Sequence, residues 1–281
     1  MEKNLSKKKV NLFIVGIAKA GTTWLHYLLD AHDEIFMSKR KEHYYFGDVY
    51  PKNIEKYEKN FPFEKSYKYF GESTPTYYLS IKIAKQIKEY SPDAKIIVLV
   101  RDPIQRLLSL IYFYKQLGNV SENQNLEEIF ENFDPELIDT SHYENTIPAF
   151  EKIIGKKNMK IFSLEKAKRD TQNFWNELQD FLELKSIDLP EIGFKNKNAT
   201  GSRAFRIFYK LTIRPIAKKY NRLYKILLKS KFLKWSKFHL LNILGKAEKD
   251  ELPAELNTKL RNKFADTYKY LEEIGFGDIY K

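Results

Sequence analysis

The sequence contains no cysteine among its 281 residues. This absence excludes disulfide frameworks, zinc sites built from thiolates and a cysteine nucleophile. Histidine is also scarce, with five residues, and none is spaced with carboxylates in the manner of a metal ligand set. Neither an H-E-x-x-H nor a G-x-S-x-G motif occurs, so catalytic zinc and a serine hydrolase triad have no support. We predict no metal site.

Long hydrophobic runs are absent as well. No run reaches the length needed to cross a membrane, and residues 1–9 lack the apolar core of a signal peptide. We therefore expect a soluble, cytoplasmic protein. A hydrophobic content of 43% with 15% aromatic residues is enough for a sizeable core, which argues against global disorder. The length suits one domain over 1–281, with a core at about 10–205 and an extension at about 206–281.

Acidic residues are missing from one long stretch, between Glu191 and Glu248. The Lys and Arg residues of this stretch outnumber the net excess of +12 for the whole chain, so the basic character is regional. Apolar residues interleave these cations. A basic amphipathic helix on an anionic bilayer is one interpretation. Helices packed on the domain with a solvated Lys face are the other, and the sequence leaves both open. No nucleic-acid-binding module is recognisable, so we expect no nucleic-acid partner.

Apolar strands alternate with helices through the first two thirds of the chain. Strands are predicted at 10–16, 34–37, from 69, 95–100 and 159–164. Helices are predicted at 22–30, 52–62, 80–90, 103–116, 126–132, 144–154, 170–183 and 253–273, with further basic helices over 203–245. This alternation predicts an α/β fold, a three-layer sandwich around a central parallel sheet, with a helical basic C-terminal part. Ligands bind at the carboxyl ends of strands in such sheets.

Residues 13–24 combine a buried strand, a tight loop with one Lys and a helix that opens on two Thr. Backbone N–H groups in such a loop point at one spot, which also lies at the positive end of the helix dipole. Two glycines have the spacing of the nucleotide-triphosphate loop, but Lys19 precedes Gly21 where that loop has Lys after glycine. We predict an anion cradle in which backbone N–H groups, Thr22 and Thr23 hold a phosphate while Lys19 reaches the transferred group.

Two further patterns carry polar groups at the same edge of the sheet. Arg101 ends one strand, and Ser109 follows two helical turns later, so a guanidinium fork and a hydroxyl are available to a second phosphate. Arg106, one turn before Ser109, either contributes or is structural. In the charged aromatic loop near residue 42, Glu42 is a candidate base and His43 is the alternative. A solvated charge run is the competing interpretation.

These motifs resemble those of the sulfotransferases that use 3′-phosphoadenosine 5′-phosphosulfate (PAPS). Their 5′-phosphosulfate loop, with Lys before Gly-Thr-Thr, resembles Val15-Gly16-Ile17-Ala18-Lys19-Ala20-Gly21-Thr22-Thr23-Trp24. Their 3′-phosphate motif, with Arg and Ser eight positions apart, resembles Val100-Arg101-Asp102-Pro103-Ile104-Gln105-Arg106-Leu107-Leu108-Ser109-Leu110-Ile111-Tyr112. The resemblance implies a P-loop NTPase-like fold, PAPS as the sulfuryl donor, 3′-phosphoadenosine 5′-phosphate (PAP) as the product, and no metal. The implied donor-binding residues are Lys19, Ala20, Gly21, Thr22, Thr23, Trp24, Arg101 and Ser109, with Gly201, Ser202 and Arg203 from a late loop.

Within the family, the motifs are most similar to the heparan-sulfate-type and bacterial carbohydrate branch. Lys41-Glu42-His43-Tyr44-Tyr45-Phe46 resembles its Lys-Glu-Pro-His-Phe-Phe loop, which implies Glu42 as the general base. The Pro and His of that loop are His43 and Tyr44 here. Gly71-Glu72-Ser73-Thr74-Pro75-Thr76-Tyr77 resembles the acceptor-side loop Glu-Lys-x-Pro-x-Tyr, with Ser73 in place of Lys. The implied substrate contacts are Glu42, Glu72, Ser73, Thr74 and Pro75.

The predicted reaction is in-line transfer of a sulfuryl group to a hydroxyl or amine of a carbohydrate or lipid-linked acceptor. Lys19 stabilises the leaving phosphate and Glu42 takes the proton. One alternative is a P-loop nucleotide kinase or NTPase in which Asp102 binds Mg²⁺. Another is a basic protein that binds membrane or anionic polymer through residues 195–246. Peripheral contact of 206–246 with the inner face of the membrane is compatible with the enzyme.

Overall fold

The computed structural model describes residues 8–121, 123–132, 134–192, 252–277 and 280 of the chain. The described residues fall into two compact units. One unit comprises residues up to Arg106, those from Asp139 to 192, and those from Phe264 onward; the other comprises Leu107–Ile138 and 252–263. The predicted basic helices over 203–245 lie outside the described residues, and the single domain over 1–281 stays a prediction.

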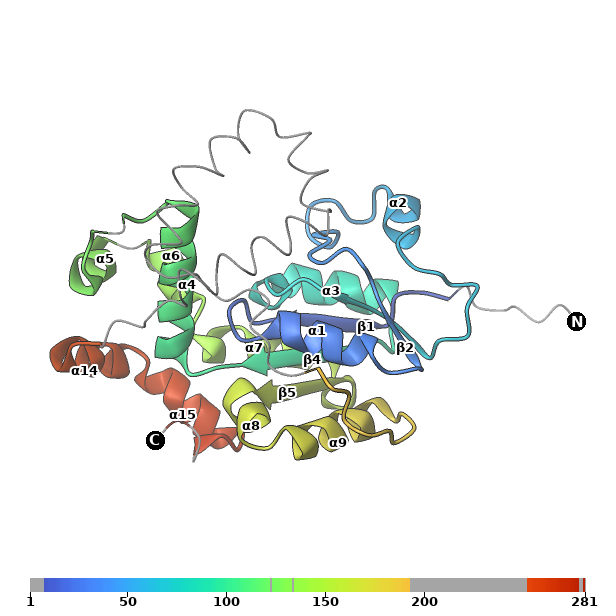
Figure 1. The fold of residues 1–281 in the computed structure, drawn as a ribbon. Coiled ribbons are helices and arrows are strands. Elements are labelled where there is room, and N and C mark those ends of the chain that lie inside the picture. Colours follow the sequence, from blue (N-terminus) through green and yellow to red (C-terminus); the bar gives the residue numbers. More distant parts are fainter. Residues whose placement is uncertain (1–7, 122, 133, 193–251, 278–279, 281) are drawn as a thin grey trace, which may run out of the picture. The chain divides into compact units, whose positions relative to one another are not determined.

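The first unit is built on a five-stranded sheet in which every strand pair is parallel. Its strands are β1 (Leu12–Gly16), β2 (Ile35–Met37), β3 (Tyr69–Ser73), β4 (Lys95–Val100) and β5 (Met159–Ser163). The strand order is β2-β3-β1-β4-β5 (Figure 1). The chain therefore fills one side of β1 before it crosses to the other side at β4. Ligands bind outside the carboxyl ends of strands where the order reverses in this way, and this places the candidate site beyond β1 and β4.

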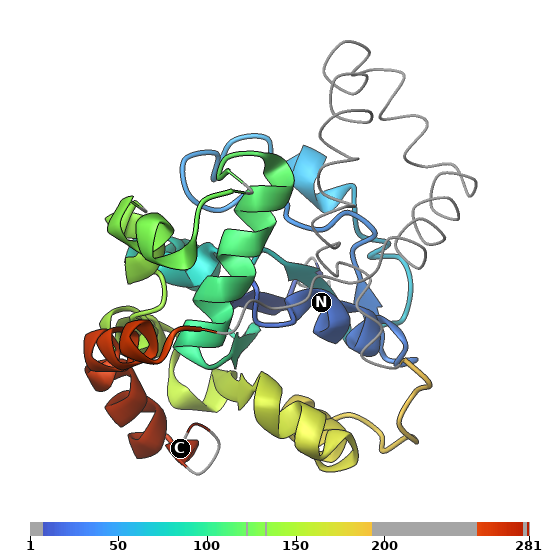
Figure 2. The same cartoon turned by 60° about the vertical axis from the view of Figure 1, so that its left-hand side comes forward.

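Helices cover both faces of the sheet, because alternate strand residues enter two separate cores. Leu12 and Ile14 pack with α1 (Thr22–Asp30), α8 (Leu164–Arg169) and α9 (Thr171–Leu182) on one face. Phe13 and Val15 pack with α3 (Ile81–Tyr90), α7 (Ile147–Ile154) and α15 (Ala265–Glu273) on the other. All six residues of β4 are buried, as expected of a central parallel strand. Figures 1 and 2 show this layering, which confirms the predicted three-layer α/β sandwich.

Several short elements differ from the predictions. The helix predicted over 52–62 is the shorter α2 (Ile54–Glu58), and α6 (Pro135–Asp139) and α8 were not predicted. Helices of one or two turns hold too few periodic positions to be recognised. The helix predicted over 253–273 is two helices, α14 (Ala254–Lys263) and α15, separated at the fully buried Phe264. The remaining elements are α4 (Pro103–Leu117), α5 (Leu126–Asn132) and the 3₁₀ turns Tyr77–Leu79, Tyr143–Asn145 and Lys156–Asn158.

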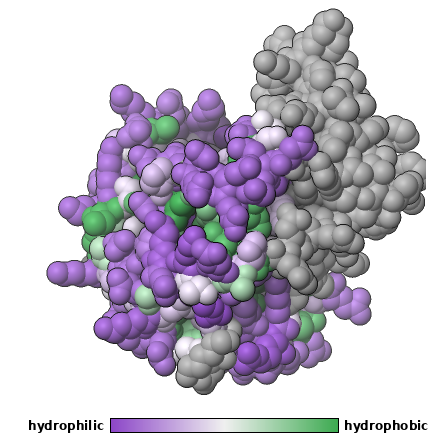
Figure 3. All heavy atoms as spheres, turned by 90° about the vertical axis from the view of Figure 1, so that its left-hand side faces the viewer, coloured by the Kyte–Doolittle hydropathy of each residue, from purple (hydrophilic) through white to green (hydrophobic). Residues whose placement is uncertain are grey.

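Polar side chains dominate the surface. Figure 3 shows one face of the molecule, where hydrophilic residues surround small, separate hydrophobic areas. Tyr44 and Ile81 are among the more exposed large apolar residues, with 52% and 49% of their surface accessible. No helix within the described ranges is both long and apolar enough to cross a bilayer.

Candidate functional site

The loop between β1 and α1 has the geometry of an anion cradle. Gly21, before the first helical residue, has a φ of 93°, and an added Cβ would lie 2.8 Å from the Leu164 side chain. Only glycine adopts this conformation without strain. Lys19 also has a positive φ, of 71°, a conformation that costs about 1–3 kcal/mol in a non-glycine residue. Such strain persists where the surrounding structure enforces it, and it is typical of functional loops.

Two arginines bind the carbonyl oxygens of this loop. Arg101 donates through Nη1 to the oxygen of Lys19 at 2.9 Å, and Arg106 donates through Nε to the oxygen of Ala18 at 3.1 Å. The N–H groups of Gly21 and Thr22 donate to no described residue. Because the carbonyls are bound elsewhere and these donors start a helix, the loop has N–H groups available for an anion.

The electrostatics of the loop also favour an anion. Burial, together with nearby Arg101 and Arg106, lowers the pKa of Lys19 to about 8, although Glu42 acts to raise it. Lys41 donates through Nζ to Thr23 Oγ1 at 2.6 Å, and burial lowers its pKa to about 8. Lys41 directly precedes Glu42 but was not among the residues predicted for the site. Several cations that lie close together and are partly desolvated bind a polyanion more strongly than exposed cations would.

Arg101 lies at the end of β4, as predicted, and its side chain is largely buried. Its Nε is 3.9 Å from Glu165 Oε1 and, within the described part of the chain, is buried without a hydrogen-bond partner. Burial lowers the pKa of this guanidinium. Arg106 is 2% exposed and donates through Nη1 to Ser141 Oγ at 2.7 Å, so its role is structural. Ser109 is half-buried on α4, in the second unit.

The remaining predicted donor residues have different placements. Ala20 is buried, and its N–H donates to Ile17 O at 3.1 Å. Trp24 packs in α1 and donates through its indole N–H to the oxygen of Ile192 at 3.2 Å. Gly201, Ser202 and Arg203 lie outside the described residues.

Glu42 projects from a loop that β3 holds in place. Its φ is 60°, its N–H donates to Ser73 O at 2.9 Å, and the next N–H, from His43, donates to Thr74 Oγ1 at 3.1 Å. The exposed Tyr44 donates through its hydroxyl to Glu42 Oε2 at 2.8 Å. Glu42 acts electrostatically on both Lys19 and Lys41. The predicted base and the predicted phosphate loop are therefore neighbours.

His43 is placed differently from Glu42. Its Nε2 lies 2.8 Å from Ser38 Oγ, and its ring packs against Tyr57 and Phe61. Burial lowers its pKa to about 4, so the ring is neutral near pH 7. With 8% of its surface exposed, the side chain supports the loop from inside. This geometry favours Glu42 over His43 as the base.

The segment predicted to contact the acceptor is buried. Glu72 is 0% exposed; its carboxylate accepts hydrogen bonds from Tyr57 and Thr74, both at 2.8 Å. Burial raises its pKa to about 7 against those hydrogen bonds. Ser73, Thr74 and Pro75 are buried too. This placement differs from the predicted role, because these side chains have no surface to offer an acceptor. Pro75 O instead accepts the N–H of Ala18 at 3.1 Å, so the segment supports the phosphate loop.

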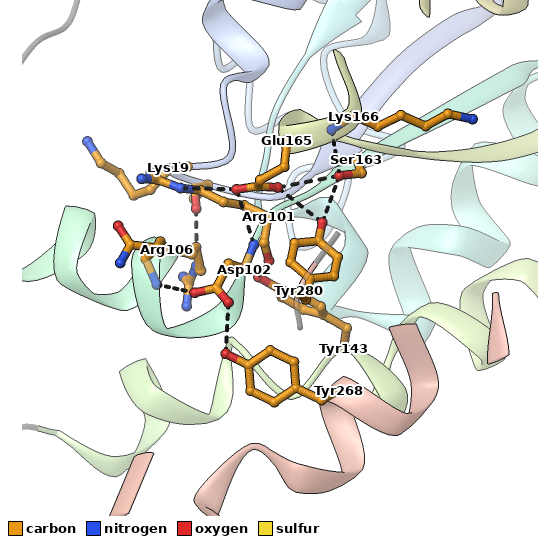
Figure 4. Close-up of polar contacts among 12 residues, drawn as sticks. Lys19, Arg101, Asp102, Arg106, Tyr143, Ser163, Glu165, Lys166, Tyr268 and Tyr280 are labelled. Atoms are coloured by element: carbon orange, nitrogen blue, oxygen red, sulfur yellow. Dashed lines mark hydrogen bonds and ion pairs between the residues drawn. The ribbon is translucent and has the colours of Figure 1, made fainter. Parts of the chain in front are cut away.

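Three further residues near the site, besides Lys41, were not predicted from the sequence. Glu165, Tyr268 and Tyr280 surround the end of β4 in Figure 4. Glu165 could have been predicted, because it is a charged residue just after the end of β5, where ligands bind in parallel sheets. The two tyrosines lie more than 160 residues after Arg101, and no local pattern links them to it.

Asp102 was the Mg²⁺ ligand of the alternative NTPase interpretation. Its Oδ1 accepts the N–H of Gln105 at 2.7 Å, and its Oδ2 accepts the hydroxyl of Tyr268 at 2.8 Å. It therefore caps α4 with one oxygen and anchors α15 with the other. No group of three His, Asp or Glu side chains suited to a metal ion occurs in the described ranges.

Comparison with known proteins gives one consistent result. The family model of the sulfotransferase domain matches residues 9–201. The membrane-associated sulfotransferase kil1 of Dictyostelium discoideum is 36% identical over 124 residues, which cover 43% of this chain and 26% of that protein. Human heparan sulfate glucosamine 3-O-sulfotransferase 3B1 is 28% identical over 200 residues, which cover 68% of this chain and 50% of that enzyme. The chain thus matches about a quarter to a half of the length of these curated relatives.

A solved structure has the same fold. The sulfotransferase from Alicyclobacillus acidocaldarius superimposes with a TM-score of 0.56 at 19% identity, covering 78% of this chain and 96% of that one.

Proposed function

The chain belongs to the sulfotransferase domain family, and we propose that it transfers a sulfuryl group from PAPS to a hydroxyl or amine of a carbohydrate acceptor. The observation that carries this proposal is the meeting of Lys19, Arg101 and Glu42 at one strand edge, around a loop with available N–H groups. The loop N–H groups and Arg101 suit an anionic donor, Lys19 suits the leaving phosphate, and Glu42 suits the proton of the acceptor.

The residues fit a donor with two phosphate positions. The N–H groups of Gly21 and Thr22, with Lys19 beside them, suit the phosphosulfate end. The buried Nε of Arg101, which has no hydrogen-bond partner among the described residues, suits the 3′-phosphate, because such a guanidinium donor gains a full hydrogen bond when it meets an anion. Ser109 and the 201–203 loop are proposed as further contacts on the strength of the sequence alone.

The chemistry assigned to each side chain follows from its surroundings. PAPS supplies an activated sulfuryl group, and negative charge grows on the bridging oxygen as the bond to phosphate breaks. The ammonium of Lys19 is half-buried, so it stabilises that charge more strongly than an exposed Lys would. The carboxylate of Glu42 removes the acceptor proton, and the hydroxyl of Tyr44 fixes its orientation.

The acceptor class is proposed from the relatives and from the surface beside Glu42. Several relatives are named for sulfation of heparan sulfate glucosamine. The exposed ring of Tyr44 provides an aromatic surface next to the proposed base, and such surfaces suit the apolar faces of sugars. A lipid-linked carbohydrate is the second candidate, because one relative is named as membrane-associated. We propose a cytoplasmic location with peripheral contact of 206–246 at the inner face of the membrane.

Direct binding of PAP tests the proposal. Wild type, Lys19→Ala and Arg101→Ala are compared by calorimetry on the full chain. We expect each substitution to weaken PAP binding about tenfold or more, since each removes a charge-assisted contact. If neither does, the donor assignment is wrong. Activity with PAPS that disappears in Glu42→Gln but survives in His43→Gln would support Glu42 as the base. Activity that needs ATP and Mg²⁺ and ignores PAPS would favour the kinase alternative.

A further inference from the structure

The C-terminal segment contributes two tyrosine hydroxyls to the neighbourhood of Arg101. Tyr280 lies 2.8 Å through its hydroxyl from Ser163 Oγ and donates to Glu165 Oε2 at 3.1 Å. Ser163 Oγ is itself 3.4 Å from the same oxygen of Glu165. Figure 4 shows Tyr280, Ser163 and Glu165 meeting beside the end of β4. One oxygen of the Glu165 carboxylate is thus held by two hydroxyls.

The other oxygen of Glu165 faces the Arg101 strand end. Oε1 accepts the N–H of Asp102 at 3.4 Å and lies 3.9 Å from Arg101 Nε. That separation is within ion-pair range but beyond a hydrogen bond. Arg101 Nε therefore has an ionic neighbour and, among the described residues, no acceptor. A small rotation of the carboxylate toward Arg101 would close this gap.

A second tyrosine holds the backbone of the same strand end. Tyr268, on α15, donates to Asp102 Oδ2 at 2.8 Å, while Asp102 Oδ1 caps α4. Tyr143 donates through its hydroxyl to the carbonyl oxygen of Arg101 at 2.9 Å. Arg101 and Asp102 are thereby fixed between α15 and the 3₁₀ turn at Tyr143.

We propose that Tyr280 and Tyr268 are positioning residues of the donor site, which hold Glu165 and Asp102 so that Arg101 keeps a guanidinium N–H for the 3′-phosphate. This inference rests on the proposed function. A carboxylate and a phosphate compete for the same guanidinium fork. Tyr280 occupies the far oxygen of Glu165, so the carboxylate stays at 3.9 Å and does not consume the donor. Donor affinity in this protein thus depends on the hydroxyls of Tyr268 and Tyr280.

The test is Tyr280→Phe in the full chain, with Tyr270→Phe as the matched control. Tyr270 lies on α15 and is half-buried, whereas Tyr280 is buried, and the hydroxyl of Tyr270 forms no hydrogen bond with a described residue. We expect Tyr280→Phe to raise the PAP dissociation constant and the donor KM about three- to tenfold, the size of effect that one ordinary hydrogen bond has, because Tyr280 acts on the donor only through Glu165. Tyr268→Phe raises both to a smaller extent. The acceptor KM and kcat stay unchanged in both variants.

A merely structural role predicts another result. Partial unfolding lowers the fraction of protein that binds PAP, but leaves the dissociation constant and the KM of the remainder unchanged. The Glu165→Gln variant separates a positioning role of Tyr280 from a structural one more clearly, because it removes the carboxylate charge that competes with the phosphate for Arg101. In that background we expect Tyr280→Phe to have no further effect on PAP affinity. Should Tyr280→Phe fail to fold, Ser163→Ala releases the same carboxylate oxygen and replaces it in the experiment.

Failure of this inference is distinguishable from failure of the proposed function. If wild type binds PAP and Arg101→Ala weakens binding while Tyr280→Phe and Ser163→Ala do not, the inference alone is overturned. It is also overturned if the Tyr280→Phe effect persists undiminished in Glu165→Gln. If wild type does not bind PAP, the proposed function itself is overturned.

Discussion

At the scale of single residues, the contact between Tyr44 and Glu42 lies on the side of the site that we propose for the acceptor. The branch loop that this segment resembles carries His where this chain carries Tyr44. A phenol hydroxyl donates only one hydrogen bond, and here it is directed at Glu42 Oε2. Burial and the adjacent Glu42 raise the pKa of Tyr44 to about 12. The hydroxyl therefore stays protonated through the neutral range and acts as a fixed donor.

We predict that Tyr44→Phe lowers kcat about three- to tenfold, because the carboxylate of Glu42 loses the donor that orients it. Tyr44→Ala additionally raises the acceptor KM, since the exposed ring is gone. Steady-state kinetics with varied acceptor separate the two effects. Tyr67→Phe, a half-buried tyrosine far from this loop in sequence, is the control. Equal kcat values for Tyr44→Phe and wild type would contradict the orienting role.

Lys19 gives the site a characteristic pH dependence. Its pKa is about 8 in the folded protein, against 10.5 for a free lysine. Above pH 8 the free protein loses the proton, whereas a bound phosphate retains it through charge attraction. The stability of the fold changes in the opposite direction to PAP affinity. Between pH 8 and 10.5 the unfolded chain holds more protons on Lys19 than the folded protein does, so Lys19 makes the free energy of unfolding rise with pH over this range.

We therefore predict that the PAP dissociation constant rises about tenfold between roughly pH 7.5 and 9, from the loss of one charge. Lys41, with a pKa also near 8, adds to the slope if it contacts the donor. Lys19→Arg keeps its charge throughout this range, so its pH profile is flatter. Calorimetry at four pH values measures both profiles. A wild-type profile that is flat up to pH 9 would remove Lys19 from the donor site.

At the scale of elements, the β1–α1 loop depends on one glycine. Gly21 combines a φ of 93° with a close approach to Leu164. Gly155 has a similar φ of 95°, but nothing lies within 4 Å of an added Cβ. The two glycines share a positive φ, but they differ in ψ, which is 10° at Gly21 and 137° at Gly155, and in crowding.

We predict that Gly21→Ala lowers the free energy of unfolding by about 2–4 kcal/mol. Two costs add up to this value: the new Cβ overpacks against its neighbours, and alanine is strained in the left-handed backbone conformation. Gly155→Ala costs about 1–2 kcal/mol and leaves PAP binding intact. Urea unfolding measures the stabilities and calorimetry the binding. If Gly21→Ala binds PAP as wild type does, the cradle does not depend on this conformation.

Element by element, the sequence was most informative where periodicity and motif coincide. The apolar run 96–100, which follows Lys95, predicted β4 correctly, and the strand, loop and helix over 13–24 were found because hydrophobic pattern and turn residues agree. Neither signal indicates which side chains contact one another in the folded protein. The burial of Glu72 and His43, and the contacts of Tyr268 with Asp102 and of Tyr280 with Glu165, arise only from tertiary packing.

At the scale of the whole chain, topology explains why three distant motifs converge. The order β2-β3-β1-β4-β5 puts the carboxyl ends of β3 and β4 on either side of β1. The loop near Glu42 is tied to β3, the phosphate loop leaves β1, and Arg101 leaves β4. The alternation of strands and helices in the sequence predicts that the carboxyl ends of the parallel strands lie at one edge of the sheet. It does not predict which strands are neighbours, because the strand order is set where the chain crosses from β3 to β4 on the other side of β1.

The basic segment between Glu191 and Glu248 remains to be connected with this enzyme core. Deletion of 207–246 removes eleven cations and no acidic residue, which lowers the net charge from +12 to +1. If the segment holds the protein at an anionic surface, the full chain binds vesicles containing phosphatidylserine and the deletion variant does not. Each cation near such a surface contributes about 1 kcal/mol, an attraction that salt screens.

We accordingly predict that vesicle binding of the full chain weakens at least tenfold between about 0.05 and 0.3 M salt, while PAP binding by the deletion variant stays within about threefold of wild type. Cosedimentation measures the first and calorimetry the second. Neutral phosphatidylcholine vesicles are the control, because they offer the same apolar interior without the charge. Binding that is unchanged by the deletion would assign the cations to solvated helix faces, and the acceptor would then have to reach the site without help from this segment.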